Sequence, residues 1–203
     1  MKTTSFFHNQ NLAIEIWVRI LHDIHPKNMD IIYLFGQTRD NQASVLNVGA
    51  KLWLANKNSV ILIDDGTTRS GYLGYKVWFE ELVKHGVQPK SIKPLKIDGD
   101  LNTLTESIAL VKYIGLLSNK NTIIVSSPFH QVRAFLTVVG IIEKTKVNIN
   151  IYNKCGEVVD WNRVVFHSQG TLKNTRKGLI SDETKRIEKY YEQGDLTSLE
   201  KVR

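Results

Sequence analysis

Hydrophobic residues in this chain occur in short unbroken runs and in longer stretches where they recur every three or four positions. Unbroken runs are typical of strands buried on both faces of a sheet, and the spaced pattern is typical of amphipathic helices. The runs predict strands over residues 30–35, 59–63, 92–97, 122–126 and 147–152. The spaced stretches predict helices over residues 10–24, 41–56, 73–85, 103–117, 128–139 and 182–193.

The predicted strands and helices alternate, with short connections, through most of the chain. This order predicts an α/β fold: a Rossmann-like open parallel sheet of about five strands with helices on both faces. Pro94 cannot donate a hydrogen bond to a neighbouring strand, so we expect the third strand at an edge. We expect the strand order 3-2-1-4-5, in which the first and fourth strands flank the point where the order reverses. Thr103 and Glu106 form the expected capping box of the helix after the third strand.

We expect a single domain over residues 1–203, with an α/β core at about residues 29–152 and the helix of residues 10–24 before it. After residue 155 the strand pattern weakens, and residues 156–203 read as a polar segment followed by a charged helix. This C-terminal helical extension is too short and too charged to form a core of its own. We therefore expect it to pack on the α/β core.

The net charge of +7 raises the question of a nucleic-acid partner. The basic residues are interleaved with acidic ones, as in KRIEKYYEQGD, and no Arg-rich, zinc-finger or RNP-like segment is present. We therefore expect no nucleic acid, and a nucleic-acid binder is an alternative that rests on net charge alone. A modest attraction to phosphate-bearing ligands follows from the same charge.

Two sequence features concern the location of the protein. Cys155 is the only cysteine, which excludes an intrachain disulfide and agrees with a reduced environment. The most apolar N-terminal stretch, LAIEIWVRI, is interrupted by Glu15 and Arg19, and no unbroken apolar run approaches the ~18 residues of a membrane span. We expect a soluble cytoplasmic protein with no membrane span, and the sequence does not indicate an oligomeric state.

Polar residues follow four of the predicted strands, where ligands of open parallel sheets bind. Because the carboxyl ends of parallel strands meet at one edge of the sheet, we expect these residues to lie around one pocket. The ligand-binding residues predicted on this basis are Gly36, Gln37, Arg39, Asp65, Gly66, Asn102, Thr103, Ser126 and Ser127.

The segment SSPFHQVRA, residues 126–134, joins the fourth strand to the next helix. We predict that Ser127 caps this helix and that Pro128 occupies its first position. The free N–H groups and the helix dipole then favour an anion at this end. His130 and Arg133 are three residues apart and share one helix face, so an imidazole and an arginine fork could bind the same phosphate or carboxylate.

His130 and Arg133 are the predicted catalytic residues. The helix dipole favours the neutral form of the His130 imidazole, which can then act as a general acid or base. The alternative is structural: His130 is packed, and Arg133 pairs with a surface acid. The spacing of the two residues favours neither interpretation.

Asp64, Asp65 and Asp98 follow neighbouring predicted strands and form a candidate metal site. Carboxylates set close together repel each other unless a cation or a proton intervenes, and Mg²⁺ bound with a phosphate needs only one or two of them. The alternative is a turn in which Asp64, Asp65 and Gly66 satisfy backbone groups. No Gly-x-Gly-x-x-Gly motif follows the first strand, and Tyr72 stands where a P-loop after Gly66 needs lysine.

The motifs LFGQTRD, ILIDDG, LNTLTES and IIVSSPFHQVRA occur over roughly residues 29–141, and their order resembles that of the SanA/YdcF/ElyC family. The last motif is the most specific and corresponds to the family pattern Thr-Ser-x-x-His-x-x-Arg-Ala. The resemblance implies a Rossmann-like domain with a pocket at the carboxyl ends of the strands. It also implies pocket roles for Asn102, Thr103, His130 and Arg133, with Gly66 in a glycine-rich second loop.

Three positions depart from the family pattern. After the second strand, residues 64–66 read Asp-Asp-Gly where the family usually has Ser-Gly-Gly. Gly74 stands where the family has an acidic residue near the start of the next helix, and Ile97 stands where it has a glutamate at the end of the third strand. Family chemistry that depends on these acids would need the neighbouring aspartates in their place. Many members carry N-terminal membrane helices, and this chain resembles the soluble members, for which binding of S-adenosylmethionine has been suggested.

The first functional hypothesis is a small-molecule enzyme, a transferase or hydrolase, that acts on a phosphate-bearing or nucleotide-like ligand. The anion would be held at the N-terminus of the helix after strand four, and His130 would transfer a proton. The alternative is a non-catalytic nucleotide or S-adenosylmethionine binding or regulatory domain. S-adenosylmethionine and Mg²⁺ are the candidate cofactors, and the expected partner is an anionic small molecule.

Overall fold

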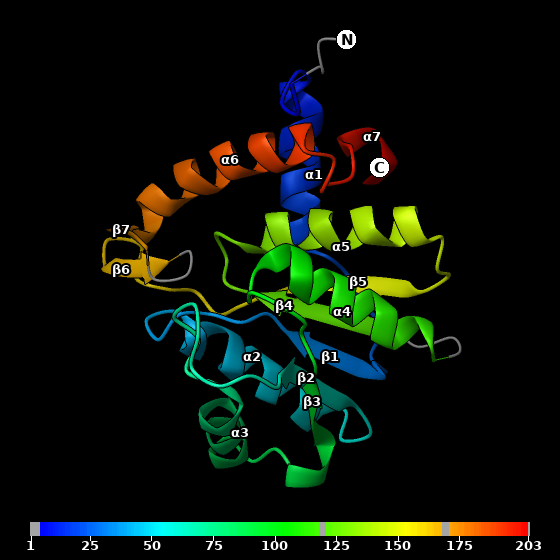
Figure 1. Ribbon diagram of the computed structural model, residues 1–203, viewed down its shortest axis with the longest axis vertical. Coiled ribbons are helices and arrows are strands. Elements are labelled where there is room, and N and C mark those ends of the chain that lie inside the picture. The colour runs from blue at the N-terminus through cyan, green and yellow to red at the C-terminus, as the bar shows by residue number, and fades with distance from the viewer. Residues whose placement is uncertain (1–4, 118–120, 168–170, 203) are drawn as a thin grey trace.

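The computed structural model describes residues 5–117, 121–167 and 171–202 (Figure 1). Its centre is a parallel five-stranded sheet in the order β3-β2-β1-β4-β5, which confirms the predicted α/β fold and strand order. The unbroken apolar runs form the inner strands, whose side chains are buried on both faces of the sheet. The strands are β1 (Ile31–Leu34), β2 (Val60–Asp64), β3 (Ile92–Leu95), β4 (Asn121–Ser126) and β5 (Asn150–Cys155).

Helices cover both faces of this sheet (Figure 1). The helices α2 (Gln42–Ala55) and α3 (Tyr75–Lys84) pack on one face, and α4 (Thr103–Gly115) and α5 (Gln131–Thr145) pack on the other. Since successive side chains of a strand point to opposite faces, Ile32 packs with α2 and Tyr33 packs with α4 and α5. As predicted, the proline-containing strand β3 lies at an edge, directly after the short 3₁₀ helix η1 (Pro89–Ser91).

Three further helices pack against α5. They are α1 (Gln10–Leu21), α6 (Arg176–Glu192) and α7 (Leu199–Val202) (Figure 1). One hydrophobic cluster joins them to α5, and its buried members include Ile16, Ile20, Leu136, Ile187 and Leu199. This packing brings polar side chains of α6 to the end of the sheet where β1 and β4 finish.

Two parts of the C-terminal segment differ from the prediction. The strands β6 (Val164–His167) and β7 (Leu172–Thr175) form an antiparallel pair in a stretch that the sequence predicts only as polar. In β6, buried Val165 and His167 alternate with exposed neighbours, and its apolar run, residues 164–166, is only three residues long, shorter than the runs that predict the other strands. The helix α6 begins at Arg176 and not at residue 182, because Thr175 accepts a hydrogen bond from the Gly178 N–H and caps the helix there.

The described helices are short relative to a bilayer. The longest of them, α6, has 17 residues and is rich in charged side chains. A helix needs about 20 apolar residues to cross the hydrocarbon core. Within the ranges 5–117, 121–167 and 171–202, no helix meets both the length and the hydropathy that a membrane crossing requires.

Candidate functional site

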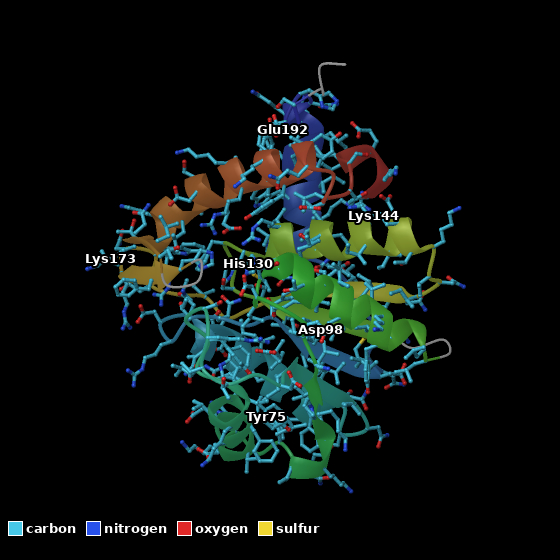
Figure 2. All side chains as sticks on the ribbon, in the orientation of Figure 1. Tyr75, Asp98, His130, Lys144, Lys173 and Glu192 are labelled. Carbon is cyan, nitrogen blue, oxygen red and sulfur yellow. The ribbon has the colours of Figure 1, made fainter. Side chains whose placement is uncertain are left out.

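A cavity of about 330 Å³ lies at the carboxyl ends of β1 and β4, the edge of the sheet where the sequence predicts a pocket. Its wall combines the loop after β1, the N-terminal turns of α4 and α5, and side chains from β6 and α6. Figure 2 shows His130 beside the ends of α4 and α5 that face α6 and the β6–β7 hairpin. The polar lining includes Gln37, Thr103, Glu106, His130, Arg133 and Arg186.

His130 lines the cavity and is only 4% exposed. Its ring lies between two hydroxyl groups: Nδ1 is 2.9 Å from Ser126 Oγ, and Nε2 is 3.0 Å from Thr103 Oγ1. Burial, reinforced by the positive charge of Arg133, lowers the pKa of His130 well below its usual value. The imidazole is therefore neutral at neutral pH, as predicted, although burial and not the helix dipole is the main cause.

The start of α5 differs from the predicted cap. His130 is the N-cap residue, and Gln131 is the first helical residue. The carbonyl oxygen of Ser127 accepts hydrogen bonds from the N–H groups of His130 and Gln131, so the chain makes an extra turn before α5 begins. The Ser127 hydroxyl is buried and has no hydrogen-bond partner among the described residues. The prediction that Ser127 caps the helix and Pro128 begins it is therefore wrong.

All three guanidinium nitrogens of Arg133 donate hydrogen bonds within the protein. Nε and Nη2 donate to the two carboxylate oxygens of Glu183, at 2.5 and 3.2 Å, and Nη1 donates to Thr103 Oγ1 at 2.7 Å. Burial raises the pKa of Glu183, but the charge of Arg133 and a hydrogen bond from His167 outweigh burial and hold that pKa well below its usual value. The Arg133 guanidinium, which the sequence predicts to bind a ligand, thus binds a carboxylate of the protein. That carboxylate is buried, whereas the structural alternative expects a surface acid.

Thr103 connects the two predicted catalytic residues, because its hydroxyl lies within hydrogen-bond distance of both His130 and Arg133. It occupies the first position of α4, directly after the N-cap residue Asn102. Asn102 caps the helix through its side chain, and Thr105 completes the capping box. The predicted box of Thr103 and Glu106 is therefore wrong by one residue, which leaves both of those side chains at the cavity.

Glu106 belongs to this site, although the sequence analysis assigns it to a helix cap. Its side chain is buried, and Oε1 accepts hydrogen bonds from Tyr33 Oη at 2.9 Å and from the Gly36 N–H at 2.7 Å. Burial raises the pKa of Glu106 to about 8, although these two hydrogen bonds oppose the shift. At neutral pH the carboxyl is therefore largely protonated and can donate a hydrogen bond. The spacing of three residues from Thr103, which places both on one helix face, is the signal that could have identified Glu106.

Gly36 and Gln37, in the loop after β1, line the cavity as predicted. A Cβ atom at Gly36 would lie 3.3 Å from Leu101 and 3.4 Å from Glu106 Oε1, so the close approach of this backbone to Glu106 favours glycine. Gln37 Nε2 lies 3.4 Å from His130 Nδ1. Gln37 Oε1 is buried and accepts no hydrogen bond from any described residue, so it is an unused acceptor at the cavity wall.

Five other predicted ligand-binding residues lie outside the cavity wall. Ser126 does not line the cavity, but its hydroxyl contacts Nδ1 of His130, which does. Ser127 is buried in the turn before α5. Arg39 and Asp65 are exposed, and Gly66 lies half-buried in the loop after β2. Of the predicted ligand-binding residues, the cavity thus brings together Gly36, Gln37, Asn102 and Thr103.

The three aspartates predicted as a metal site do not come together. Asp64 is buried, and its Oδ1 accepts hydrogen bonds from Arg69 Nη2 at 2.8 Å and from a backbone N–H at 3.3 Å. Burial raises the pKa of Asp64, and Arg69 opposes this shift. Asp65 and Asp98 are exposed. In the described part of the chain no group of three His, Cys, Asp or Glu side chains could hold a metal ion, so the predicted three-aspartate site is wrong.

The C-terminal segment contributes several residues that the sequence analysis does not associate with the site. His167 of β6 and Arg186 and Tyr190 of α6 line the cavity. Glu183 of α6 does not line the cavity but binds Arg133, which does. No local pattern marks these residues, because their place depends on how α6 packs against α5.

Comparisons with known proteins assign no family. No protein-family model matches the chain, and a search of curated proteins finds no significant match. The resemblance to the SanA/YdcF/ElyC family therefore stays a prediction, and the function is inferred from the geometry of the cavity.

Proposed function

We propose that this protein is a small-molecule enzyme that binds a phosphate-bearing or nucleotide-like substrate in the cavity and uses His130 to transfer a proton. The observation that carries the proposal is a neutral, buried imidazole held between two hydroxyl groups at the cavity wall. The volume of about 330 Å³ suits a small molecule, since ligand pockets begin at roughly 300 Å³.

Two helix N-termini support an anionic substrate. Asn102, the N-cap of α4, and His130, the N-cap of α5, both line the cavity. Helix N-termini carry partial positive charge and backbone N–H groups without intrahelical partners. The Asn102 side chain already accepts hydrogen bonds from the first N–H groups of α4, whereas no side chain caps α5. A phosphate group between the two helices would therefore receive backbone hydrogen bonds mainly from α5 and a favourable field from both.

His130 is suited to accept a proton from Thr103. The neutral ring carries one N–H, which Ser126 Oγ can accept at Nδ1, and this tautomer leaves Nε2 free to accept the Thr103 hydroxyl proton. Arg133 donates to the same hydroxyl oxygen, so it stabilises negative charge that develops there. Thr103 thus links the base to a substrate in the cavity.

Glu106 supplies the opposite proton-transfer role. Burial raises the pKa of Glu106 to about 8 and lowers the pKa of His130, so the carboxyl is protonated and the imidazole is unprotonated at neutral pH. Two titratable groups whose pKa values are moved apart in this way can serve as general acid and general base. We assign His130 as the base, Thr103 as the hydroxyl between base and substrate, and Glu106 as the acid.

A second candidate is a non-catalytic domain that binds a nucleotide or S-adenosylmethionine. It is favoured by the engagement of both His130 ring nitrogens with protein hydroxyls, which a purely structural histidine also shows. The resemblance to SanA/YdcF/ElyC proteins supports a ligand in the same pocket for either function. For either one we propose a cytoplasmic location, which the single cysteine supports.

The test begins with a thermal-shift screen of the full chain against inorganic phosphate, AMP, ATP, a phosphosugar and S-adenosylmethionine, each with and without Mg²⁺. Turnover of each stabilising compound is then measured in the wild type, in His130→Gln and in His85→Gln, which changes an exposed histidine outside the cavity. We expect His130→Gln to keep binding and to lose ~10²-fold or more in turnover, while His85→Gln resembles the wild type. Binding without turnover in the wild type would support the binding domain, and no stabilisation by any compound would contradict both functions.

A further inference from the structure

We propose that Arg186 of α6 binds the anionic group of the substrate, so that the C-terminal segment completes the site. This inference rests on the proposed function and identifies the cation that meets the anion. The sequence predicts Arg133 for that role. The contacts of the two arginines lead to the opposite assignment.

Arg133 has less donor capacity left for a ligand than Arg186, because three of its five N–H groups already donate within the protein. Its side chain is buried, and each guanidinium nitrogen already donates to Glu183 or Thr103. The anion that this arginine recognises is therefore the carboxylate of Glu183. Arg133 stabilises the attachment of α6 to α5 and fixes the Thr103 hydroxyl.

Arg186 lines the same cavity with most of its donors unused. Its Nη1 donates to Glu183 Oε1 at 3.2 Å, and its Nε and Nη2 groups donate to no described residue. The side chain is 21% exposed, in contrast to the buried Arg133. A planar guanidinium with a free edge can bind a phosphate or a carboxylate through two parallel hydrogen bonds.

The charges on the described residues leave an excess positive charge at the cavity. Glu183 contacts both Arg133 and Arg186, so two cations share one carboxylate. Asp195 also lines the cavity, but its carboxylate lies 3.9 Å from a lysine ammonium group of α5. Glu106 adds no full negative charge at neutral pH, because burial raises its pKa to about 8. An anionic group in the cavity would therefore be complementary to its wall.

The position of Arg186 also fits an anion close to the reacting groups. Its charge makes a smaller contribution to the lowered pKa of His130, after burial, Arg133 and His167. Tyr190 follows Arg186 by about one helical turn and lines the cavity on the same face of α6. The helix thus presents a cation and an aromatic ring together, which suits a phosphate or carboxylate attached to a small organic group.

The test measures binding of inorganic phosphate, AMP and acetate to the full chain by isothermal titration calorimetry. Arg186→Gln removes the charge, Arg186→Lys keeps the charge without the planar fork, and Lys185→Gln removes a neighbouring exposed charge outside the cavity. We expect Arg186→Gln to weaken binding by about tenfold or more, Arg186→Lys to recover only part of the loss, and Lys185→Gln to match the wild type. The tighter of phosphate and acetate identifies the class of anion.

The Arg186 variants should remain folded, because Glu183 keeps Arg133 and His167 as partners. Circular dichroism and the melting temperature check this point. If Arg186→Gln unfolds, the affinity of Arg186→Lys tests the inference instead. Full affinity in Arg186→Lys overturns recognition of the anion by the planar guanidinium, and weakened affinity supports it. Unchanged affinity in a folded Arg186→Gln protein overturns this inference alone. Absence of binding by the wild type overturns the proposed function as well.

Discussion

Replacing Arg133 with alanine should destabilise the protein by about 3 kcal/mol, because it leaves the buried carboxylate of Glu183 without its main partner. Breaking a buried ion pair by removing one member costs ~3–5 kcal/mol, since the remaining charge is poorly solvated. The lower end of this range applies because His167 and Arg186 still contact Glu183. In a chain of 203 residues this loss corresponds to a fall of roughly 6–12 °C in melting temperature.

The loss should depend on pH in a defined direction. In the folded state the pKa of Glu183 is held well below its unfolded value, so the carboxylate contributes stability above that unfolded value. This contribution is lost as the pH falls through the folded pKa. The difference between the wild type and Arg133→Ala should therefore be full at neutral pH and should shrink below about pH 4.

Urea unfolding followed by circular dichroism measures the difference in the free energy of unfolding. Arg163→Ala is the matched control, because this exposed arginine lies 3.9 Å from Asp40 and its loss should cost at most ~0.5 kcal/mol. The double variant Arg133→Met/Glu183→Leu should recover most of the lost stability, because it removes the unpaired charge as well. An Arg133→Ala protein as stable as the wild type would show that the pairing of Arg133 with Glu183 does not stabilise the fold. That result would favour the ligand-binding role that the sequence predicts for Arg133.

Three other predictions concern single side chains. The folded pKa of Glu106, about 8, exceeds its unfolded value, so its contribution to stability is full below the unfolded pKa and is lost as the pH rises through about 8. The free energy of unfolding of Glu106→Gln should therefore rise relative to that of the wild type between about pH 5 and about pH 9. A difference in free energy of unfolding that stays constant over this pH range would contradict this. Thr103→Val should keep phosphate binding and lose ~10²-fold or more in turnover, and equal turnover would exclude Thr103 from proton transfer. Cys155 should react slowly with a thiol reagent until urea unfolds the protein, because burial raises its thiol pKa to about 11; equal native and unfolded rates would oppose this.

The strands that the sequence analysis missed show where local pattern stops being informative. β6 and β7 are four residues each, and only alternate residues of β6 are buried. The apolar run of β6 spans only residues 164–166, which is too short to predict a strand, and β7 is mostly polar. The caps of α4 and α5 were misplaced for a related reason: several neighbouring residues could cap each helix, and the path of the preceding turn selects among them.

Local sequence pattern is enough to predict the sheet and the location of the pocket. A strand buried on both faces must be apolar along its length, and a proline belongs where its missing N–H is not needed, so local pattern identifies the inner strands and the edge strand β3. Because parallel strands end at one edge, the residues that follow them were also predictable as neighbours. The structure places Gly36, Gln37, Asn102, Thr103 and His130 around one cavity.

Which charged groups are available to a ligand depends on the packing of elements that lie far apart in the sequence. Arg133 and Glu183 are 50 residues apart, and the spacing around Arg133 is the same whether it binds a substrate or a carboxylate. The packing of α6 against α5 buries Glu183 beside Arg133 and leaves Arg186 at the cavity. Burial likewise makes Glu106 a protonated acid. Hydrophobic periodicity acts along the chain and can be recognised in the sequence, whereas desolvation and ion pairing act through space between elements that only folding brings together.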